Sequence, residues 1–160
     1  HSLVATCTRL GRTDPAGSPC ADALAARDID LVARTSAIGD RMVRAVERIK
    51  RRAPGATVAV VGYLRLVPST GRCADLPFAQ GDYAHGRRVI GALNAALERA
   101  ARRTGALFVD MHAASAGHDV CAAEPWVNGR RTIEGEALAY HPLAEGMEAA
   151  ADELLAQLPG

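Results

Sequence analysis

Two uninterrupted apolar runs, separated by a long helical pattern, dominate the distribution of hydrophobic positions along this chain. Residues 57–63 read Thr-Val-Ala-Val-Val-Gly-Tyr, and residues 106–110 read Ala-Leu-Phe-Val-Asp. A run without polar interruptions is typical of a strand buried on both faces, and such strands belong to parallel sheets that helices cover. We therefore predict two buried parallel strands at these positions.

The segments around these runs repeat their apolar residues with helical spacing. We expect helical character over about 21–52, with a break near Thr35–Ser36, and a second helix over 83–103 that ends at Gly105. A third helix closes the chain. The expected inner faces are Ile38, Met42, Val46 and Ile49 in the first helix, Ile90, Leu93, Leu97 and Ala100 in the second, and Met147, Ala151, Leu154 and Leu158 in the third.

The order helix, strand, helix, strand, loop, helix predicts one α/β domain over residues 1–160, with right-handed crossovers and parallel strands. Residues 1–8 are expected to end a strand or begin a loop, and residues 9–20 to form a loop. Two strands alone make an unstable parallel sheet, because its edges stay open. We therefore expect further strands to precede residue 1 and the isolated chain to self-associate. The missing initiator methionine agrees with a numbering that begins inside a longer protein.

The composition of the chain argues against some classes of function. With a net charge of +1 there is no electrostatic case for binding nucleic acid or an anionic membrane. No apolar run approaches the ~20 residues of a membrane span, so no transmembrane segment is expected. The first residues also lack the charged and apolar regions of a signal peptide.

Four cysteines, Cys7, Cys20, Cys73 and Cys121, allow three disulfide pairings. The economical pairing is Cys7–Cys20, which brackets a loop, with Cys73–Cys121, which joins the loops after the two strands. In the loop-entropy model these bridges contribute roughly 3 and 4 kcal/mol. They would indicate export from a reducing cytoplasm, whereas the alternative is four buried free thiols.

The polar loop after the second strand holds the candidate chemistry. His141-Pro142 precedes the last helix, where a histidine can act as general base to a serine. An ordinary surface histidine fits the same pattern. No serine stands in a Gly-x-Ser-x-Gly or Gly-Asp-Ser context, and Ser115 is better explained as small-residue packing in the loop.

A metal site is the next possibility in this loop, but no metal or other cofactor is expected. The possible ligands match no closed zinc pattern in their spacing, and they are Asp110, His112, His118, Asp119 and Cys121. Trp126 and the following Val127-Asn128-Gly129 suggest a turn with an aromatic wall. That turn suits an acyl pocket and loop packing equally well.

Several short motifs in order carry a resemblance to a known family. They are Val-Gly-Tyr63, the Cys73 loop, Val-Asp110 leading into Ala-Gly-His-Asp-Val-Cys121, Pro-Trp-Val-Asn-Gly129, and His141-Pro142 with Gly146. Together they resemble the secreted bacterial SGNH hydrolases, the GDSL-type esterases and lipases, over essentially the whole chain.

The resemblance implies a three-layer flavodoxin-like fold that hydrolyses a small-molecule or lipid carboxylic ester outside the cell. His141 corresponds to the general base, and Tyr63, Trp126 and Asn128 are candidate substrate-binding residues. Many members place an aspartate three residues before this histidine, where this chain has Leu138. A backbone carbonyl orients the histidine in some members, so we expect the Leu138 carbonyl to do so here. The cysteines resemble two of the family's disulfides.

The departures from the family pattern define two functional hypotheses. The Gly-Asp-Ser block, the oxyanion glycine and the Gly-Gly-Asn-Asp block are absent from these 160 residues. The chain thus resembles the carboxyl-terminal portion of such an enzyme, with the nucleophile in a segment outside it and little activity alone. The alternative is a non-catalytic binding or accessory domain on the same scaffold.

Overall fold

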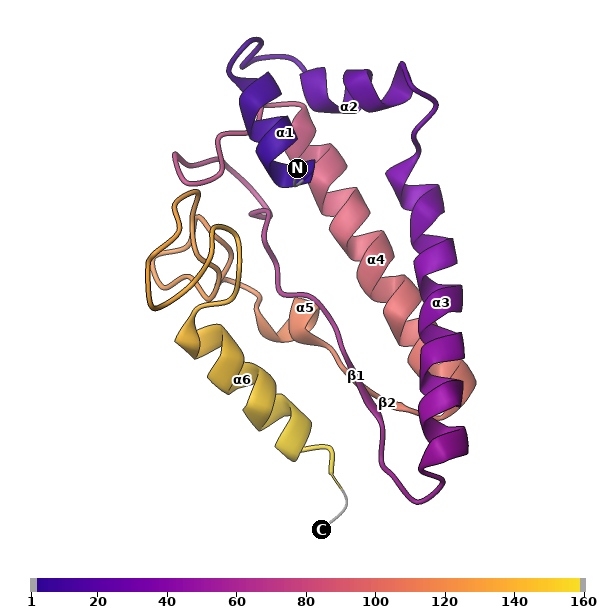
Figure 1. The fold of residues 1–160 in the computed structure, drawn as a ribbon. Helices are drawn as coiled ribbons and strands as arrows, with labels where there is room; N and C mark the ends of the chain where they lie inside the picture. Colours follow the sequence, from indigo (N-terminus) through magenta and orange to yellow (C-terminus); the bar gives the residue numbers. More distant parts are fainter. Residues whose placement is uncertain (1–2, 159–160) are drawn as a thin grey trace.

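The computed structural model describes residues 3–158 and shows an α/β arrangement (Figure 1). Its central strands carry helices on both sides, as the sequence predicted. The elements in chain order are α1 (Leu3–Gly11), α2 (Pro19–Ala25), α3 (Leu31–Arg52), β1 (Ala59–Val61), α4 (Asp82–Thr104), β2 (Leu107–Val109), α5 (Met111–Ala114) and α6 (Ala144–Leu155). In the part of the chain that the structure describes, no helix is long and apolar enough to cross a membrane.

The two strands pair in parallel, and both lie within the predicted apolar runs. Val60 pairs with Phe108 at the centre of the register. The Leu107 N–H donates to the Val58 carbonyl and the Gly62 N–H to the Val109 carbonyl, each at 2.9 Å. The predicted parallel α/β class is confirmed, although the regular strands are shorter than the apolar runs.

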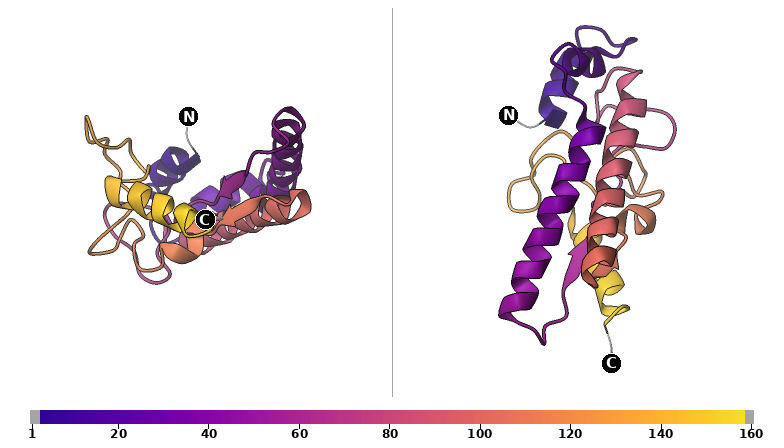
Figure 2. Two further views of the ribbon diagram at one scale, coloured as in Figure 1. Left: turned by 90° about the horizontal axis from the view of Figure 1, so that it is seen from below. Right: turned by 90° about the vertical axis from the view of Figure 1, so that its right-hand side faces the viewer.

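Helix α4 covers one side of these strands and forms the main core with α3. Val60 of β1 packs with Val46 of α3 and with Leu97 and Ala101 of α4. Helix α6 lies on the other side of the strands, away from α3 and α4 (Figures 1 and 2). The predicted end of α4 is confirmed, because Gly105 follows it in the left-handed conformation, with φ of 63°.

The expected inner face of α3 is confirmed for Val46, which is buried, and for Met42, which packs against the core, but the buried face of the helix is rotated from the expected one. Its buried residues are Thr35, Gly39, Val43 and Val46. Ile38 and Ile49, expected inside, are 38% and 47% exposed. The cause is a close approach to α4, since a Cβ on Gly39 would lie only 3.1 Å from the Ala96 carbonyl. Small residues thus set the contact, and the larger apolar side chains flank it.

The closing helix also differs from its prediction. Met147, expected inside, is exposed, and Leu158 lies beyond the end of α6. The helix instead contacts the preceding loop through Gly146, where a Cβ would lie 2.6 Å from the Trp126 carbonyl.

The amino-terminal region is helical where a strand tail and a loop were expected. Helices α1 and α2 occupy most of residues 3–25, and the break before α3 lies at residues 26–30 rather than at Thr35–Ser36. Asp30 begins α3 by accepting the Ala33 N–H at 3.0 Å. Asp30 lies inside the helix that the sequence predicted, but its cap marks the start of α3.

A buried carboxylate joins the amino-terminal helices to α4. Asp82 accepts the Cys20 N–H at 3.0 Å and the Ala21 N–H at 2.9 Å, so it caps the first turn of α2 from a distant element. The sequence gives no local sign of this contact, because the partners are more than 60 residues apart.

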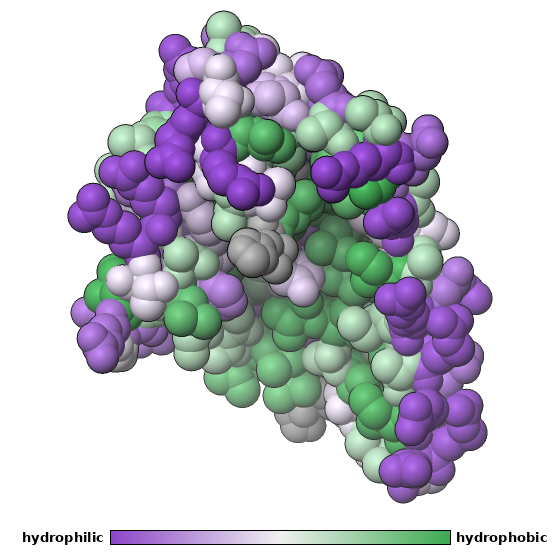
Figure 3. Space-filling view, turned by 45° about the horizontal axis from the view of Figure 1, so that its top comes forward, coloured by the Kyte–Doolittle hydropathy of each residue, from purple (hydrophilic) through white to green (hydrophobic). Residues whose placement is uncertain are grey.

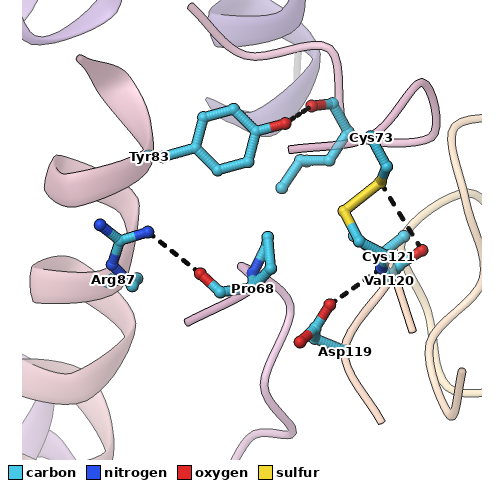
Figure 4. Close-up of a disulfide and its surroundings, with 8 residues drawn as sticks. Pro68, Cys73, Tyr83, Arg87, Asp119, Val120 and Cys121 are labelled. Atoms are coloured by element: carbon cyan, nitrogen blue, oxygen red, sulfur yellow. Dashed lines mark hydrogen bonds between the residues drawn. A yellow bond between two sulfur atoms is a disulfide. The ribbon is translucent and has the colours of Figure 1, made fainter. Parts of the chain in front are cut away.

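Both economical disulfides are confirmed. Cys7–Cys20 joins α1 to α2 with a Cα–Cα distance of 4.9 Å, and Cys73–Cys121 joins the loops after β1 and β2 at 5.5 Å. Figure 4 shows the second bridge, where the Asp119 carboxylate accepts the Cys121 N–H at 2.9 Å. The two loops that follow the strands are therefore held together covalently.

One face of the molecule is hollowed and apolar. Figure 3 shows hydrophobic residues gathered in its centre, with hydrophilic residues along the right-hand border. Val61 of β1 is 45% exposed. Between α1 and α4 lies a cavity of about 180 Å³ whose apolar lining includes Leu3, Val4, Leu66, Phe78, Val89 and Ile90.

Candidate functional site

The side chain of His141 is held by a backbone carbonyl next to it in sequence. Its Nδ1 lies 2.9 Å from the Ala139 carbonyl oxygen. A carbonyl oxygen can only accept, so Nδ1 carries the hydrogen and Nε2 of the neutral ring keeps its lone pair. The side chain is exposed. The geometry therefore presents Nε2 to solvent as a proton acceptor.

The orienting carbonyl differs from the expected one. The Leu138 carbonyl does not contact the His141 ring but accepts the His141 backbone N–H at 3.1 Å. The chain reverses direction at residues 138–141, and the turn brings the carbonyl of Ala139 to the ring instead. The prediction that the Leu138 carbonyl orients the ring is therefore wrong, and the carbonyl at Nδ1 is that of Ala139.

The backbone around His141 is fixed by an antiparallel contact with residues 127–129. The Asn128 N–H donates to the His141 carbonyl at 2.9 Å, and the Tyr140 N–H donates to the Gly129 carbonyl at 3.1 Å. Tyr140 itself has a φ of 63°, an uncommon value for a residue other than glycine. Such strained backbone persists only where surrounding contacts impose it. The histidine thus sits on a constrained turn.

Asn128, a candidate substrate-binding residue, is 6% exposed and supports this turn. Its side-chain nitrogen lies within hydrogen-bond distance of three carbonyls, those of Arg131 at 2.8 Å, Ala137 at 3.0 Å and Leu138 at 3.1 Å. The contacts close the loop 130–138 from inside. The structure therefore places Asn128 beneath the loop that leads to His141.

Trp126 packs on a second histidine. Its ring stacks on that of His118 with centroids 4.2 Å apart and planes 9° from parallel. The His118 Nδ1 lies 2.8 Å from the Glu124 carbonyl, and the Trp126 carbonyl accepts the Leu143 N–H at 2.9 Å. These contacts connect the loop to the start of α6.

Tyr63, the remaining candidate, follows β1 and is 57% exposed. Its backbone N–H donates to Oδ1 of the buried Asn94 at 2.7 Å. A Cβ on the neighbouring Gly62 would lie 2.7 Å from that same oxygen, so glycine is required there. Tyr63, Trp126 and Asn128 are not among the residues that line the cleft containing His141.

Ser115 contributes to the packing of its loop, as its sequence context predicted. It is fully buried, its hydroxyl donates to the Met111 carbonyl at 2.6 Å, and its Oγ accepts the Arg65 N–H at 2.8 Å. The first hydrogen bond closes the end of α5, and the second joins the loop after β1 to it. A hydroxyl engaged in this way is unsuited to nucleophilic attack.

The side chains considered as metal ligands do not form a common binding site in the described residues. Within residues 3–158, no group of three or more histidine, cysteine, aspartate or glutamate residues is arranged to hold a metal ion. Asp110 caps α5 by accepting the Ala113 N–H at 3.0 Å. The pKa of His112 is lowered by burial and, to a lesser degree, by the charge of Arg65, while Asp110 opposes the shift.

The cleft beside His141 contains residues that the sequence did not single out. It has a volume of about 430 Å³. Its lining comprises Ala5, Thr8, Arg9, Arg12, Pro77, Arg130, Ala139, Tyr140 and His141. Arg9 comes from α1, Arg12 from the turn that follows it, and Arg130 from the loop after Gly129. Arg9 and Arg12 are three residues apart, a spacing that places both on one face of a helix. Because residues 9–20 were predicted to form a loop, this spacing did not identify them.

The chain belongs to the GDSL-like Lipase/Acylhydrolase family, whose model matches residues 13–149. Lipase 2 of Streptomyces coelicolor is 37% identical over 139 residues, which cover 81% of this chain and 45% of that protein. A lipase of Streptomyces rimosus is 33% identical over 101 residues, covering 62% of this chain and 36% of that protein. The chain thus spans less than half the length of these curated relatives.

Solved structures show the same fold. The crystal structure of phospholipase A1 from Streptomyces albidoflavus NA297 matches 98% of this chain and 62% of its own, with a TM-score of 0.70 and 21% identity. The extracellular lipase of Streptomyces rimosus matches 96% and 63%, with a TM-score of 0.68 and 24% identity. The expected SGNH-hydrolase fold is therefore confirmed, with a small parallel sheet.

Proposed function

We propose that this chain supplies the general base of a carboxylic-ester hydrolase, with His141 as that base and the serine nucleophile in a segment outside these 160 residues. The hydrogen bond between His141 Nδ1 and the Ala139 carbonyl carries the proposal. It favours the tautomer in which Nε2 can accept a proton, at the edge of an open cleft. Family membership supports the reaction class.

In the proposed reaction, Nε2 of His141 removes the hydroxyl proton of the serine as its oxygen attacks the ester carbonyl. The protonated ring then returns the proton to the leaving alcohol. The Ala139 carbonyl accepts from Nδ1–H throughout and stabilises the positive ring that forms. The substrate is a small-molecule or lipid ester, and Tyr63 and Trp126 remain predicted contacts to it.

The open edge of β1 supports a segment outside the chain. Among residues 3–158, β1 pairs only with β2. Because Val58 and Gly62 direct backbone groups toward β2, the alternation of a parallel ladder directs those of Ala59 and Val61 to the other edge. A further strand can pair there and bring the nucleophile to the carboxyl ends of the strands.

The tautomer is the first test. Nitrogen-15 NMR of the neutral imidazoles should show hydrogen on Nδ1 of His141, whereas free histidine favours Nε2. His118, whose Nδ1 also meets a carbonyl, is an internal control for the same tautomer. A neutral His141 with its hydrogen on Nε2 would remove the basis of the proposal.

The second test is hydrolysis of a short-chain aryl ester. The 160-residue chain alone should show little turnover, because the absent oxyanion donors are worth ~3 kcal/mol each in such enzymes. Adding the segment encoded immediately upstream should create turnover, and His141→Ala should reduce it about 10³-fold or more while His118→Ala does not. Turnover in the chain alone that His141→Ala abolishes would place the nucleophile inside it.

A non-catalytic accessory domain is the second candidate, and the lack of a Gly-Asp-Ser block in this sequence favours it. The upstream coding sequence separates the two candidates. A Gly-Asp-Ser block there supports the hydrolase, and an upstream region without one supports the accessory domain. In either case the two disulfides and the lipase relatives support an extracellular location.

A further inference from the structure

We propose that Arg9, Arg12 and Arg130 form an anion subsite that binds the phosphate group of the ester substrate beside His141. The substrate would then be an acyl ester of a glycerophosphate rather than a neutral ester. This inference rests on the proposed function, since it assigns the substrate class of that same site. It starts from the three guanidinium groups that line the His141 cleft.

The amphipathic character of α1 and the turn at its end bring two of these arginines, Arg9 and Arg12, to the cleft. Ala5, Thr8, Arg9 and Arg12 all line it and follow one another at i, i+3, i+4 and i+7, which is one face of a helix. The opposite face of α1, with Leu3, Val4 and Cys7, lines the apolar cavity instead. The helix thus separates an apolar cavity from a basic cleft.

The third arginine comes from a different element. Arg130 follows Gly129, whose carbonyl accepts the Tyr140 N–H, so it belongs to the turn that holds His141. The side chain of Asn128 closes this loop from inside. Basic groups far apart in the sequence are therefore brought to one cleft by tertiary contacts.

The charge of the cleft is unbalanced. None of its lining residues is acidic, although the whole chain has a net charge of only +1. Among the described residues, the arginines within salt-bridge distance of a carboxylate are Arg51, Arg102 and Arg103, all outside this cleft. Asp75 is an acid close to this loop, because a Cβ on Gly129 would lie 2.9 Å from its Oδ1. Clefts of one sign attract ligands of the opposite charge.

The scaffold beneath Arg9 and Arg12 is cross-linked and closely packed. The Cys7–Cys20 disulfide ties α1 to α2. A Cβ on Gly11 would lie 2.6 Å from the Ala79 nitrogen, so the end of α1 packs directly on the loop that includes Pro77. Guanidinium groups bind phosphate oxygens through paired N–H donors, and a fixed scaffold reduces the entropy lost on binding.

Binding to the 160-residue chain tests the subsite without requiring turnover. The probes are dibutyrylglycerophosphate below its micelle concentration, neutral dibutyrylglycerol, and inorganic phosphate, each titrated while the His141 and Tyr140 NMR signals are followed. We expect the glycerophosphate ester to bind about tenfold or more tightly than the neutral ester, with affinity that falls as salt rises. Inorganic phosphate should shift the same signals with weaker affinity.

Charge-neutral variants locate the subsite. Arg9→Gln, Arg12→Gln and Arg130→Gln should each weaken binding of the glycerophosphate ester by about fivefold, as expected for one exposed charge-assisted contact. Arg41→Gln, Arg44→Gln and Arg48→Gln on the exposed side of α3 are matched controls with the same change of charge, and they should bind as the parent does.

Three results would overturn the subsite. They are equal binding of the neutral ester, equal effects of the cleft and control variants, and inorganic phosphate binding as tightly as the glycerophosphate ester. The last result would assign the cleft to free phosphate. A failure of the proposed role of His141 can be distinguished from a failure of the subsite. In that case His141→Ala would leave turnover of the completed enzyme intact, while the arginines would still bind the glycerophosphate ester.

Discussion

The β1–α4–β2 unit and the amino-terminal region, residues 3–30, are stabilised by different interactions. In the first, Val60, Leu97 and Ala101 are buried along apolar patterns that are visible in the sequence. In the second, a disulfide, a distant carboxylate and a close glycine contact hold two short helices. The comparison shows that regular burial makes a region predictable, whereas a few long-range contacts can order a region that has no such pattern.

The largest effect should come from the apolar unit. Leu97 is 3% exposed in the core between α3, α4 and β1. Leu97→Ala should lower the free energy of unfolding by about 3 to 4 kcal/mol, because it removes buried methyl groups and leaves a cavity. Urea unfolding measures this. Leu155→Ala, at an exposed position of α6, is the control, and a similar loss there would contradict the assignment of the core.

Removal of the Cys7–Cys20 disulfide should destabilise the amino-terminal region. Replacing Cys7 and Cys20 together with serine should cost about 2 to 3 kcal/mol, since the bridge closes a loop of 13 residues. Hydrogen exchange should accelerate in α1 and α2 and remain slow in α4. Equal acceleration in α4 would show that the two regions do not differ in this way.

The buried carboxylate connects the two regions. Asp82→Ala should cost about 2 kcal/mol, because the N–H groups of Cys20 and Ala21 lose their acceptor. Thermal or urea unfolding of this variant should be compared with that of Asp152→Ala, which changes an exposed residue of α6. If the two variants unfold alike, the Asp82 cap contributes nothing measurable.

The smallest effect should be a pH dependence at the carboxyl end of β2. Burial and Arg65 lower the pKa of His112, so as pH falls the unfolded chain takes up a proton that the folded chain resists. Stability should therefore decrease from about pH 7 to about pH 5, and His112→Gln should reduce that decrease. Urea midpoints at both pH values measure it, with His118→Gln as control. An unchanged decrease in His112→Gln would exclude this contribution.

Much of the fold was predictable from short-range patterns. The two strands, α4 and its end at Gly105 follow from apolar runs, helical spacing and a left-handed glycine. The buried faces of α3 and α6 were predictable only in part, because Gly39 and Gly146 permit close approaches that rotate each helix toward its neighbour. Hydropathy ranks side chains by size and polarity, and it cannot show where a backbone comes into contact.

The residues of the candidate site were likewise predictable in part and dependent on tertiary contacts in part. His141 was identified from its motif, but the carbonyl at its Nδ1 is that of Ala139, since the turn geometry selects the residue. Asn128, expected at the substrate, supports the loop from inside. The arginines of the cleft were not predicted, because residues 1–8 were expected to end a strand or begin a loop and residues 9–20 to form a loop.

The sequence by itself determined the parallel α/β class, the economical cysteine pairing and the histidine of the proposed site. These depend on local periodicity, on loop lengths and on a run of motifs in order. Only the tertiary structure decided which carbonyl lies at Nδ1 of His141, which helix faces are buried and that Arg9, Arg12 and Arg130 share its cleft. Those features depend on distances between segments far apart in the chain, which packing and the disulfides set.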